Sequence, residues 1–389
     1  MLDLFKRNLK IVYLSFVILF ILFFLVILPR VLSGHYISYQ KVGLADLLSG
    51  KTKAEPVFIP SYVVTPSVVK GIYMTSWVAG DKKLRDGLIN LLDDTELNTI
   101  VIDIKDYSGK IVFPITNREL NSYGSEEVRV NDLEDFIETL HKKDIYVIGR
   151  VAVFQDAYFV KYRPDLAVKN ESGTEIWKDQ KGISWIDAGS REYWDYIILL
   201  SKEARKIGFD EINFDYIRFP SDGNMNDISY PWSSTTPKIL VLKNFFEYLH
   251  NNLIDSGLKT SADLFGMTTT ALDDMGIGQV LENTLPYFDY VSPMVYPSHY
   301  SADFEGFKEP EAHPYEIVKI AMQSAVLRAK IASTSPDKLR PWLQDFGLKM
   351  SYGPTEVRAQ INATNDVGLD SWLLWSASNK YTKGALGSK

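Results

Sequence analysis

Short apolar or alternating stretches recur along the chain from Gly71 onward, and longer amphipathic stretches separate them. This alternation is typical of βαβ units, in which parallel strands are buried beneath helices. Helices are expected between the strands, for example at residues 191–206 and 238–253. The pattern predicts eight strands, at residues 71–77, 99–105, 145–153, 211–217, 259–265, 290–296, 339–345 and 371–377.

Eight strands in one run of chain predict a closed (β/α)8 barrel, the TIM barrel, because an open doubly wound sheet usually has fewer strands and a glycine-rich first turn. No G-x-G-x-x-G or Walker sequence is present, so no cofactor is expected. Few residues follow the eighth strand, which predicts a final helix that is short or absent. The long segments 154–190 and 220–237 follow strands three and four, on the face where barrels keep their active sites.

The amino-terminal region has a different pattern, since residues 11–28 are apolar and contain no charge. At 1.5 Å per residue such a helix just spans a hydrocarbon core of ~30 Å. Lys6, Arg7 and Lys10 precede this stretch, so the positive-inside rule keeps the amino terminus in the cytoplasm and exports the rest. The alternative is a cleaved signal peptide, with Val31 and Ser33 at positions −3 and −1 of the cleavage site.

The chain therefore divides into three predicted parts. Residues 1–32 form a cytoplasmic tail and a single-pass membrane anchor, and residues 69–389 form the extracytoplasmic barrel. Between them, residues 33–68 mix Gly, Lys and Ser with three prolines, which predicts a semi-extended stalk.

Composition and charge exclude several classes of function. A formal net charge of −7 leaves no basic patch for nucleic acid, and the absence of cysteine excludes disulfides, thiolate zinc sites and cysteine nucleophiles. Barrel hydrolases that use metal ions usually carry pairs of histidines at strand ends. Only His299 among the five histidines stands near such an end, so no metal is expected.

Polar residues near the last positions of the predicted strands should point into the top of the barrel. We expect Asp215 and Asp263, on strands four and five, to be the catalytic pair. Asp103 and Asp345 are possible supporting or alternative acids. Asp215 is the strongest candidate because it interrupts the apolar stretch 212–219, where an unpaired charge would be costly. Capping a helix or pairing with an arginine is the structural alternative for each of them.

A second set of residues is expected to bind the substrate, through polar groups or through aromatic faces that suit sugar rings. For the aromatic residues, packing beneath the barrel loops is the alternative. The set is Trp77, Lys105, Arg150, Asn213, Arg218, Tyr296, Trp342, Gln344 and Trp375.

Two resemblances to known families begin at the fourth predicted strand. Residues 209–216, Phe-Asp-Glu-Ile-Asn-Phe-Asp-Tyr, resemble the strand-four signature of family 18 chitinases, and Met-Val-Tyr at 294–296 is similar to their strand-six motif. The glutamate that serves those enzymes as acid corresponds to Ile217 here, so their chemistry is not carried over.

The closer resemblance, over about residues 69–381, is to a bacterial family of glycoside-hydrolase-like domains catalogued as a domain of unknown function. It rests on Gly-Ile-Tyr at 71–73 and on residues 101–106, 213–220, 340–346 and 372–375. The resemblance implies a barrel and an action on carbohydrate, without naming the sugar.

Hydrolysis of a glycosidic bond needs one carboxylic acid and one carboxylate, about 5–5.5 Å apart for retention and ~6.5–9.5 Å apart for inversion. Neighbouring strands lie roughly 4.8 Å apart, so Asp215 and Asp263 could approach the retaining separation. Alpha-amylase-like barrels also carry the nucleophile on strand four and the acid on strand five. They have a third acid on strand seven, which is the position of Asp345 here.

Arg150 and Arg218 could hold one carboxylate ionised while a more buried partner stays protonated. The competing hypothesis is a barrel that binds a cell-surface glycan without cleaving it.

Overall fold

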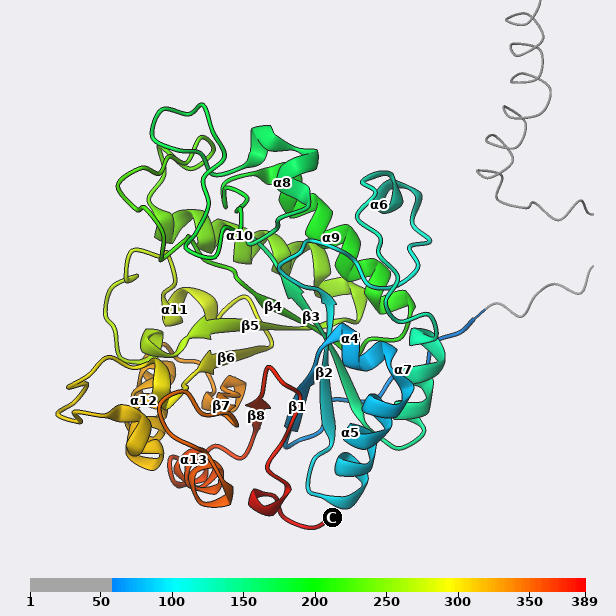
Figure 1. Ribbon diagram of the computed structural model, residues 1–389, viewed down its shortest axis with the longest axis vertical. Coiled ribbons are helices and arrows are strands. Elements are labelled where there is room, and N and C mark those ends of the chain that lie inside the picture. The colour runs from blue at the N-terminus through cyan, green and yellow to red at the C-terminus, as the bar shows by residue number, and fades with distance from the viewer. Residues whose placement is uncertain (1–57) are drawn as a thin grey trace, which may run out of the picture. The chain divides into compact units, whose positions relative to one another are not determined.

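The computed structural model describes residues 58–389, and the eight expected strands form a closed parallel barrel. Neighbours in the barrel are neighbours in sequence, and the last strand closes on the first (Figure 1). The strands are β1 (Lys70–Met74), β2 (Thr99–Lys105), β3 (Tyr146–Ala152), β4 (Glu211–Asp215), β5 (Lys259–Phe265), β6 (Tyr290–Met294), β7 (Trp342–Gln344) and β8 (Trp372–Trp375).

The predicted TIM barrel is thereby confirmed, although six of the eight strands are shorter than expected, β4 and β7 among them. β4 ends at Asp215 because Tyr216 adopts a left-handed backbone with φ of 53° and turns the chain. β7 has three residues and pairs with β6 only at Met294 and Trp342. Pro341 precedes β7, and a proline cannot donate a ladder hydrogen bond, so this seam is weakly paired.

Helices surround the barrel, and two of them, α9 and α10, have the bounds that the sequence pattern predicts. After β8 there is only a 3-10 turn, Lys383–Ala385, in place of an eighth helix, as expected. The α-helices are α4 (Ser76–Gly80), α5 (Lys82–Asp94), α6 (Arg118–Ser122), α7 (Leu133–His141), α8 (Phe159–Tyr162), α9 (Arg191–Lys206), α10 (Lys238–Leu253), α11 (Leu281–Thr284), α12 (Pro314–Ile331) and α13 (Pro354–Asp366).

Side-chain alternation along each strand separates two apolar cores. On β4, Ile212 and Phe214 face the helices and join the large outer core. The barrel interior holds a second, smaller cluster that includes Val101, Ile148 and Leu373. Inward-facing residues near the strand ends are not part of the large outer core, so polar side chains can occupy these positions. The candidate site lies there.

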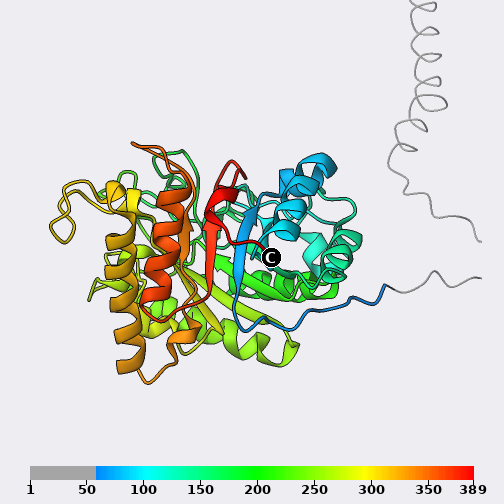
Figure 2. The same ribbon diagram turned by 90° about the horizontal axis from the view of Figure 1, so that it is seen from below.

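Residues 60–68, expected to belong to the stalk, are part of the same compact unit as the barrel, which runs from Pro60 to Lys389. The Val63 amide donates to Asp210 Oδ1 at 2.8 Å, and Ser61 Oγ lies 3.0 Å from His141 Nδ1. Figure 2 shows this segment, drawn in blue, running past the end of the barrel where the strands begin. The unit thus starts before the expected boundary at residue 69.

The predicted membrane anchor, residues 11–28, lies outside the described residues. Among the helices of residues 58–389, none combines the length and the hydropathy needed to cross a bilayer.

A chain that begins at Val69 should fold but melt several degrees below one that begins at Phe58. Asp210, His141 and Tyr146 each lose a hydrogen-bond partner from the deleted segment, and a buried polar group left without its partner costs about 1–3 kcal/mol. Thermal unfolding of the two chains, followed by circular dichroism, measures the difference. Equal melting temperatures would mean that residues 60–68 contribute nothing to the fold.

Candidate active site

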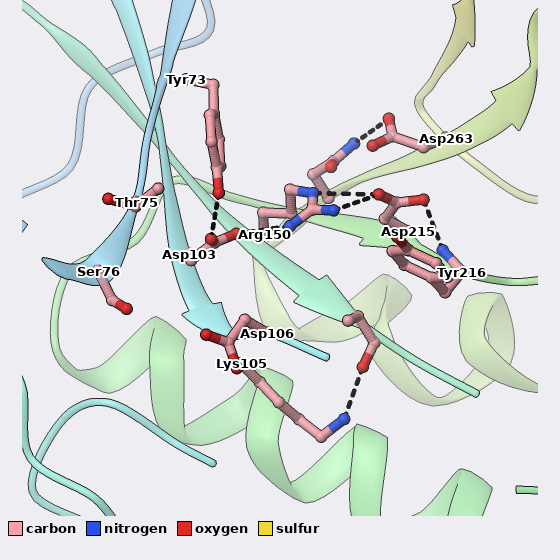
Figure 3. Close-up of polar contacts among 12 residues, drawn as sticks. Tyr73, Thr75, Ser76, Asp103, Lys105, Asp106, Arg150, Asp215, Tyr216 and Asp263 are labelled. Carbon is pink, nitrogen blue, oxygen red and sulfur yellow. Dashed lines mark hydrogen bonds and ion pairs between the residues drawn. The ribbon is translucent and has the colours of Figure 1, made fainter. Parts of the chain in front are cut away.

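The end of β4 places the carboxylate of Asp215 inside the top of the barrel, where Arg150 of β3 binds it. Arg150 donates from Nε to Asp215 Oδ2 at 3.2 Å, and its NH2 group forms an ion pair with the same oxygen (Figure 3). The other oxygen, Oδ1, accepts a 2.6 Å hydrogen bond from the Tyr216 amide. The left-handed turn at Tyr216 therefore helps to hold the Asp215 carboxylate in place.

The same arginine also binds Asp103 of β2. NH1 of Arg150 lies 2.6 Å from Asp103 Oδ1, while the phenol of Tyr73 on β1 donates to Asp103 Oδ2. Burial raises the pKa of Asp103, and the charge of Arg150 partly offsets that rise. Burial opposes the charge of Arg150, but Asp215 and Asp103 raise its pKa, so the guanidinium stays a cation between two carboxyl groups.

Asp263 on β5 has a different environment, because no cation binds it. Its Oδ1 atom accepts hydrogen bonds from Asn213 Nδ2 and from Trp342 Nε1, each at 2.8 Å. Within residues 58–389, Oδ2 has no hydrogen-bond partner. Burial, together with the nearby charge of Asp215, raises the pKa of Asp263 well above its ordinary value. Asp263 is thus the carboxyl group most favoured to carry a proton.

Aromatic side chains form one wall of this cluster. The rings of Tyr73 and Trp375 stack with centroids 4.0 Å apart, and Trp375 meets Trp342 edge to face at 5.6 Å. The guanidinium carbon of Arg150 lies 5.1 Å from the centroid of Trp375. Tyr296 is buried beside the cluster, and burial raises the pKa of its phenol.

Some of the predicted site residues lie together in the structure, and others lie elsewhere. Asp103, Arg150, Asn213, Asp215, Asp263 and Trp342 form one hydrogen-bonded or ion-paired region, and Trp375 and Tyr296 border it. Lys105 points elsewhere, because the pairing register shifts between Asp103 and Lys105 and turns that side chain out of the barrel. Its ammonium lies 2.8 Å from Asp156, and both side chains are fully buried.

Three further candidates lie outside the cluster. Asp345 accepts two hydrogen bonds from Thr382, and Gln344 joins the loops after β6 and β7 through Ser298 and Phe346. Trp77 is 64% exposed and has the guanidinium of Arg129 over its ring. The contacts of Asp345 and Gln344 connect protein segments to one another, and a role in binding substrate stays a prediction for all three.

Arg218 lies in the loop that follows β4 and does not bind a carboxylate of the cluster. Its guanidinium carbon is 4.8 Å from the ring centroid of Trp185 and 4.6 Å from that of Phe265. Ile217, at the position of the chitinase acid, is fully buried among apolar residues.

Comparison with known proteins decides the family. Residues 71–381 match the family model described as "Putative glycosyl hydrolase domain". The chain belongs to this glycosyl hydrolase family. No curated protein sequence matches it significantly.

Two solved structures with TM-scores of 0.50 or above agree with the barrel fold of this domain. The PgaB (BpsB) glycoside hydrolase domain from Bordetella bronchiseptica is 13% identical with a TM-score of 0.57, over 79% of this chain and 94% of the other. A class V chitinase from Pseudomonas fluorescens is 12% identical with a TM-score of 0.50, over 82% and 98% of the two chains. A hypothetical protein from Ruminiclostridium thermocellum is 32% identical over 49% of this chain and 96% of its own, with a TM-score of 0.45.

The sequence analysis missed two residues of the candidate site, Tyr73 and Tyr216. It searched strand ends for charged groups, whereas Tyr73 contributes a neutral hydroxyl donor and Tyr216 a backbone amide. The inward alternation of Gly71 and Tyr73 on strand one was a signal that could have found the first. The left-handed backbone of Tyr216 has no comparable signal in the sequence.

Within residues 58–389 of the glycosyl hydrolase, no group of three or more His, Asp or Glu side chains has the geometry of a metal site.

Replacing Arg150 with glutamine should destabilise the glycosyl hydrolase domain by about 3–5 kcal/mol, because two buried carboxylates lose the cation that they share. Arg163→Gln is the matched control, since Arg163 also contacts two carboxylates, Asp165 and Glu192, but at the surface. The Arg163→Gln variant should lose about 1 kcal/mol or less of its free energy of unfolding. Urea unfolding of both variants measures these values, and similar small losses would show that Asp103 and Asp215 do not depend on Arg150.

Proposed function

We propose that this protein hydrolyses glycosidic bonds of a cell-surface or extracellular polysaccharide, with Asp263 as the general acid and Asp215 as the nucleophile or base. One observation carries the proposal: Arg150 binds Asp215, whereas Asp263 is buried without a cation. Glycosidases need two carboxyl groups whose environments favour opposite protonation states. Family membership supports the same reaction class.

The roles follow from the hydrogen bonds of each carboxyl group. Asn213 and Trp342 occupy Oδ1 of Asp263, so a proton on Oδ2 is available to the oxygen of the leaving sugar. As the bond between the anomeric carbon and that oxygen breaks, positive charge develops on the sugar ring. Asp215, which forms an ion pair with Arg150, either attacks the anomeric carbon or takes a proton from the water that attacks it.

Position in the barrel also supports this pair. Phe214 of β4 pairs with Ala262 of β5, so Asp215 and Asp263 are the next residues on adjacent strands. Adjacent strands lie roughly 4.8 Å apart, which is close to the separation used by retaining enzymes. Asp103 reaches Asp215 only through Arg150, and we assign it a positioning role.

The remaining substrate contacts are also proposals. Trp375 is partly exposed and stacks on Tyr73, which gives a sugar ring a flat apolar surface beside the carboxylates. Tyr296 belongs to the same apolar cluster as this wall and can contact the same ring. We expect the substrate to lie along these aromatic side chains.

A glycan-binding barrel without hydrolase activity is the second candidate. It is favoured by the burial of the cluster, since Asp263 is 1% exposed and Asp215 6% exposed. The absence of a glutamate at Ile217 also fits this alternative.

Activity screening on bacterial polysaccharides, followed by two variants, tests the proposal. Asp263→Asn should reduce turnover of a polysaccharide by a factor of about 10²–10⁴, but much less for an aryl glycoside whose leaving group needs no proton. Wild-type activity should fall as pH rises through the raised pKa of Asp263, because only the protonated form acts, and the variant should lack this alkaline limb. Asp215→Asn should lower kcat on both substrates with little change in KM.

Asp289→Asn is the matched control, because Asp289 binds Lys259 and Thr260 where β5 begins, at the other end of the barrel. Its turnover per folded molecule should equal that of the wild type. If Asp215→Asn lowers the melting temperature and leaves turnover unchanged, Asp215 has only a structural role. If the wild type binds a glycan and cuts none, and Asp215→Asn retains the affinity, the binding alternative is correct.

We also propose that residues 11–28 are a retained anchor, with the amino terminus in the cytoplasm and the barrel outside. The uncharged stretch behind Lys6, Arg7 and Lys10 supports this topology. An extracytoplasmic location would give the barrel access to cell-surface polysaccharide.

Cell fractionation should recover the full-length chain in the membrane pellet, and protease added to spheroplasts should degrade the barrel. Mass spectrometry of the amino terminus is the control for processing. A soluble mature form that begins near Gly34 would show that the segment is a cleaved signal peptide.

A further inference from the structure

Arg218 differs from the other buried arginines of residues 58–389. Arg85, Arg150 and Arg340 each form an ion pair with a carboxylate, at Asp132, Asp103 and Asp215, and Glu211 respectively. Arg218 is 7% exposed and forms none. A buried charge without a counter-ion is costly, so its presence beside a candidate active site requires a reason.

The contacts of Arg218 orient the guanidinium without neutralising it. NH1 donates to the carbonyl of Phe219 at 2.9 Å and to Ser221 Oγ at 3.1 Å. The rings of Trp185 and Phe265 lie within 5 Å of the guanidinium carbon. Within the described residues, Nε and NH2 make no hydrogen bond, and neither is among the fully enclosed polar atoms that lack a partner. These two donors are therefore accessible to a ligand.

Three nearby carboxylates, of Asp215, Asp222 and Asp179, accept no hydrogen bond from Nε or NH2 of Arg218. Burial lowers the pKa of Arg218, and the charges of Asp215, Asp222 and Asp179 only partly offset that effect. Asp215 is bound by Arg150, and Asp179 accepts hydrogen bonds from Trp185 and Gln155. Asp222 is bound to the Gln180 amide.

We propose that Arg218 binds a negatively charged group on the substrate, so that the glycan is an anionic one, carrying either uronate carboxylates or phosphates. Parallel N–H groups from Nε and NH2 match the two oxygens of a carboxylate or phosphate, and the flanking rings keep the guanidinium plane in position. Arg218 follows Asp215 by three residues, so the anionic group would lie beside the sugar whose bond is cleaved. This inference rests on the proposed function and names its substrate class.

Affinity measurements on the full-length chain carrying Asp215→Asn test the inference without requiring hydrolysis. The probes are polygalacturonate oligosaccharides, their carboxyl-reduced neutral derivatives, and a glycerol phosphate teichoic acid with a neutral glucan for comparison. At least one anionic probe should bind roughly tenfold or more tightly than its neutral counterpart, as expected for hydrogen bonds to a charged group. The preferred probe identifies uronate or phosphate as the recognised group.

Adding Arg218→Gln should abolish this preference, and Arg218→Lys should retain part of it, because lysine keeps the charge but loses the paired donors. Arg191→Gln is the matched control, since Arg191 also stacks on aromatic rings, of Trp194 and Tyr248, but is exposed on α9. It should leave the preference unchanged. The lysine variant also serves if glutamine prevents folding, which circular dichroism would reveal.

Equal affinity of the anionic and neutral probes would overturn the inference. So would an equal loss of both affinities in Arg218→Gln and Arg218→Lys, because that result identifies Arg218 as a brace for the loop. If charge preference is found but no glycan is cleaved by the wild type, the hydrolase proposal fails and the anion site stands. If a neutral glycan is cleaved and no preference exists, the hydrolase proposal stands and the anion site fails.

Discussion

The bridge that Arg150 makes between Asp103 and Asp215 is the interaction on which the candidate site depends. Three carboxyl groups, of Asp103, Asp215 and Asp263, lie inside the top of one barrel, where burial raises the pKa of Asp103 and of Asp263. The guanidinium of Arg150 forms ion pairs with Asp103 and Asp215, whereas no cation binds Asp263. In the proposed mechanism, the difference in protonation that glycoside hydrolysis requires comes from this unequal sharing of one positive charge. Removing that charge would affect the fold and the chemistry together, because the same ion pairs serve both.

Two ion pairs elsewhere in the barrel each join a buried cation to a buried carboxylate. Near the start of the strands, Arg340 binds Glu211 at 2.6 Å, and Tyr146 donates to the same carboxylate. Lys105, the last residue of β2, forms an ion pair with Asp156 on the outer side of the sheet. Replacing such pairs with apolar residues is often neutral or stabilising in proteins, so their presence favours an interpretation in terms of specific geometry rather than gross stability. Among the four buried arginines of residues 58–389, Arg218 alone lacks a carboxylate partner, and this difference supports the proposed ligand.

The sequence was sufficient for the barrel and for most of the residues in the cluster. Strand alternation placed Asp103, Asp215 and Asp263 on inner faces, because their apolar neighbours pack beneath the helices. Predictions made from strand alternation failed where the backbone departs from regular strand geometry. The register shift after Asp103 turned Lys105 outward, and the left-handed turn at Tyr216 ended β4 at Asp215, two residues before its predicted end. Neither irregularity leaves a periodic signal, and the partnership of Arg150 with two carboxylates depends on side-chain distances that only a three-dimensional structure supplies.

In the proposed mechanism Asp263 carries a proton at neutral pH, while Asp215 forms an ion pair with Arg150. Infrared difference spectroscopy of the wild type against Asp263→Asn, recorded as a function of pH, measures the protonation of Asp263 directly. A protonated carboxyl group absorbs in a region distinct from that of a carboxylate, and the variant identifies the band of Asp263. The account predicts a protonated band at neutral pH that disappears only well above the ordinary range of an aspartate. A carboxylate band for Asp263 throughout the neutral range would contradict it.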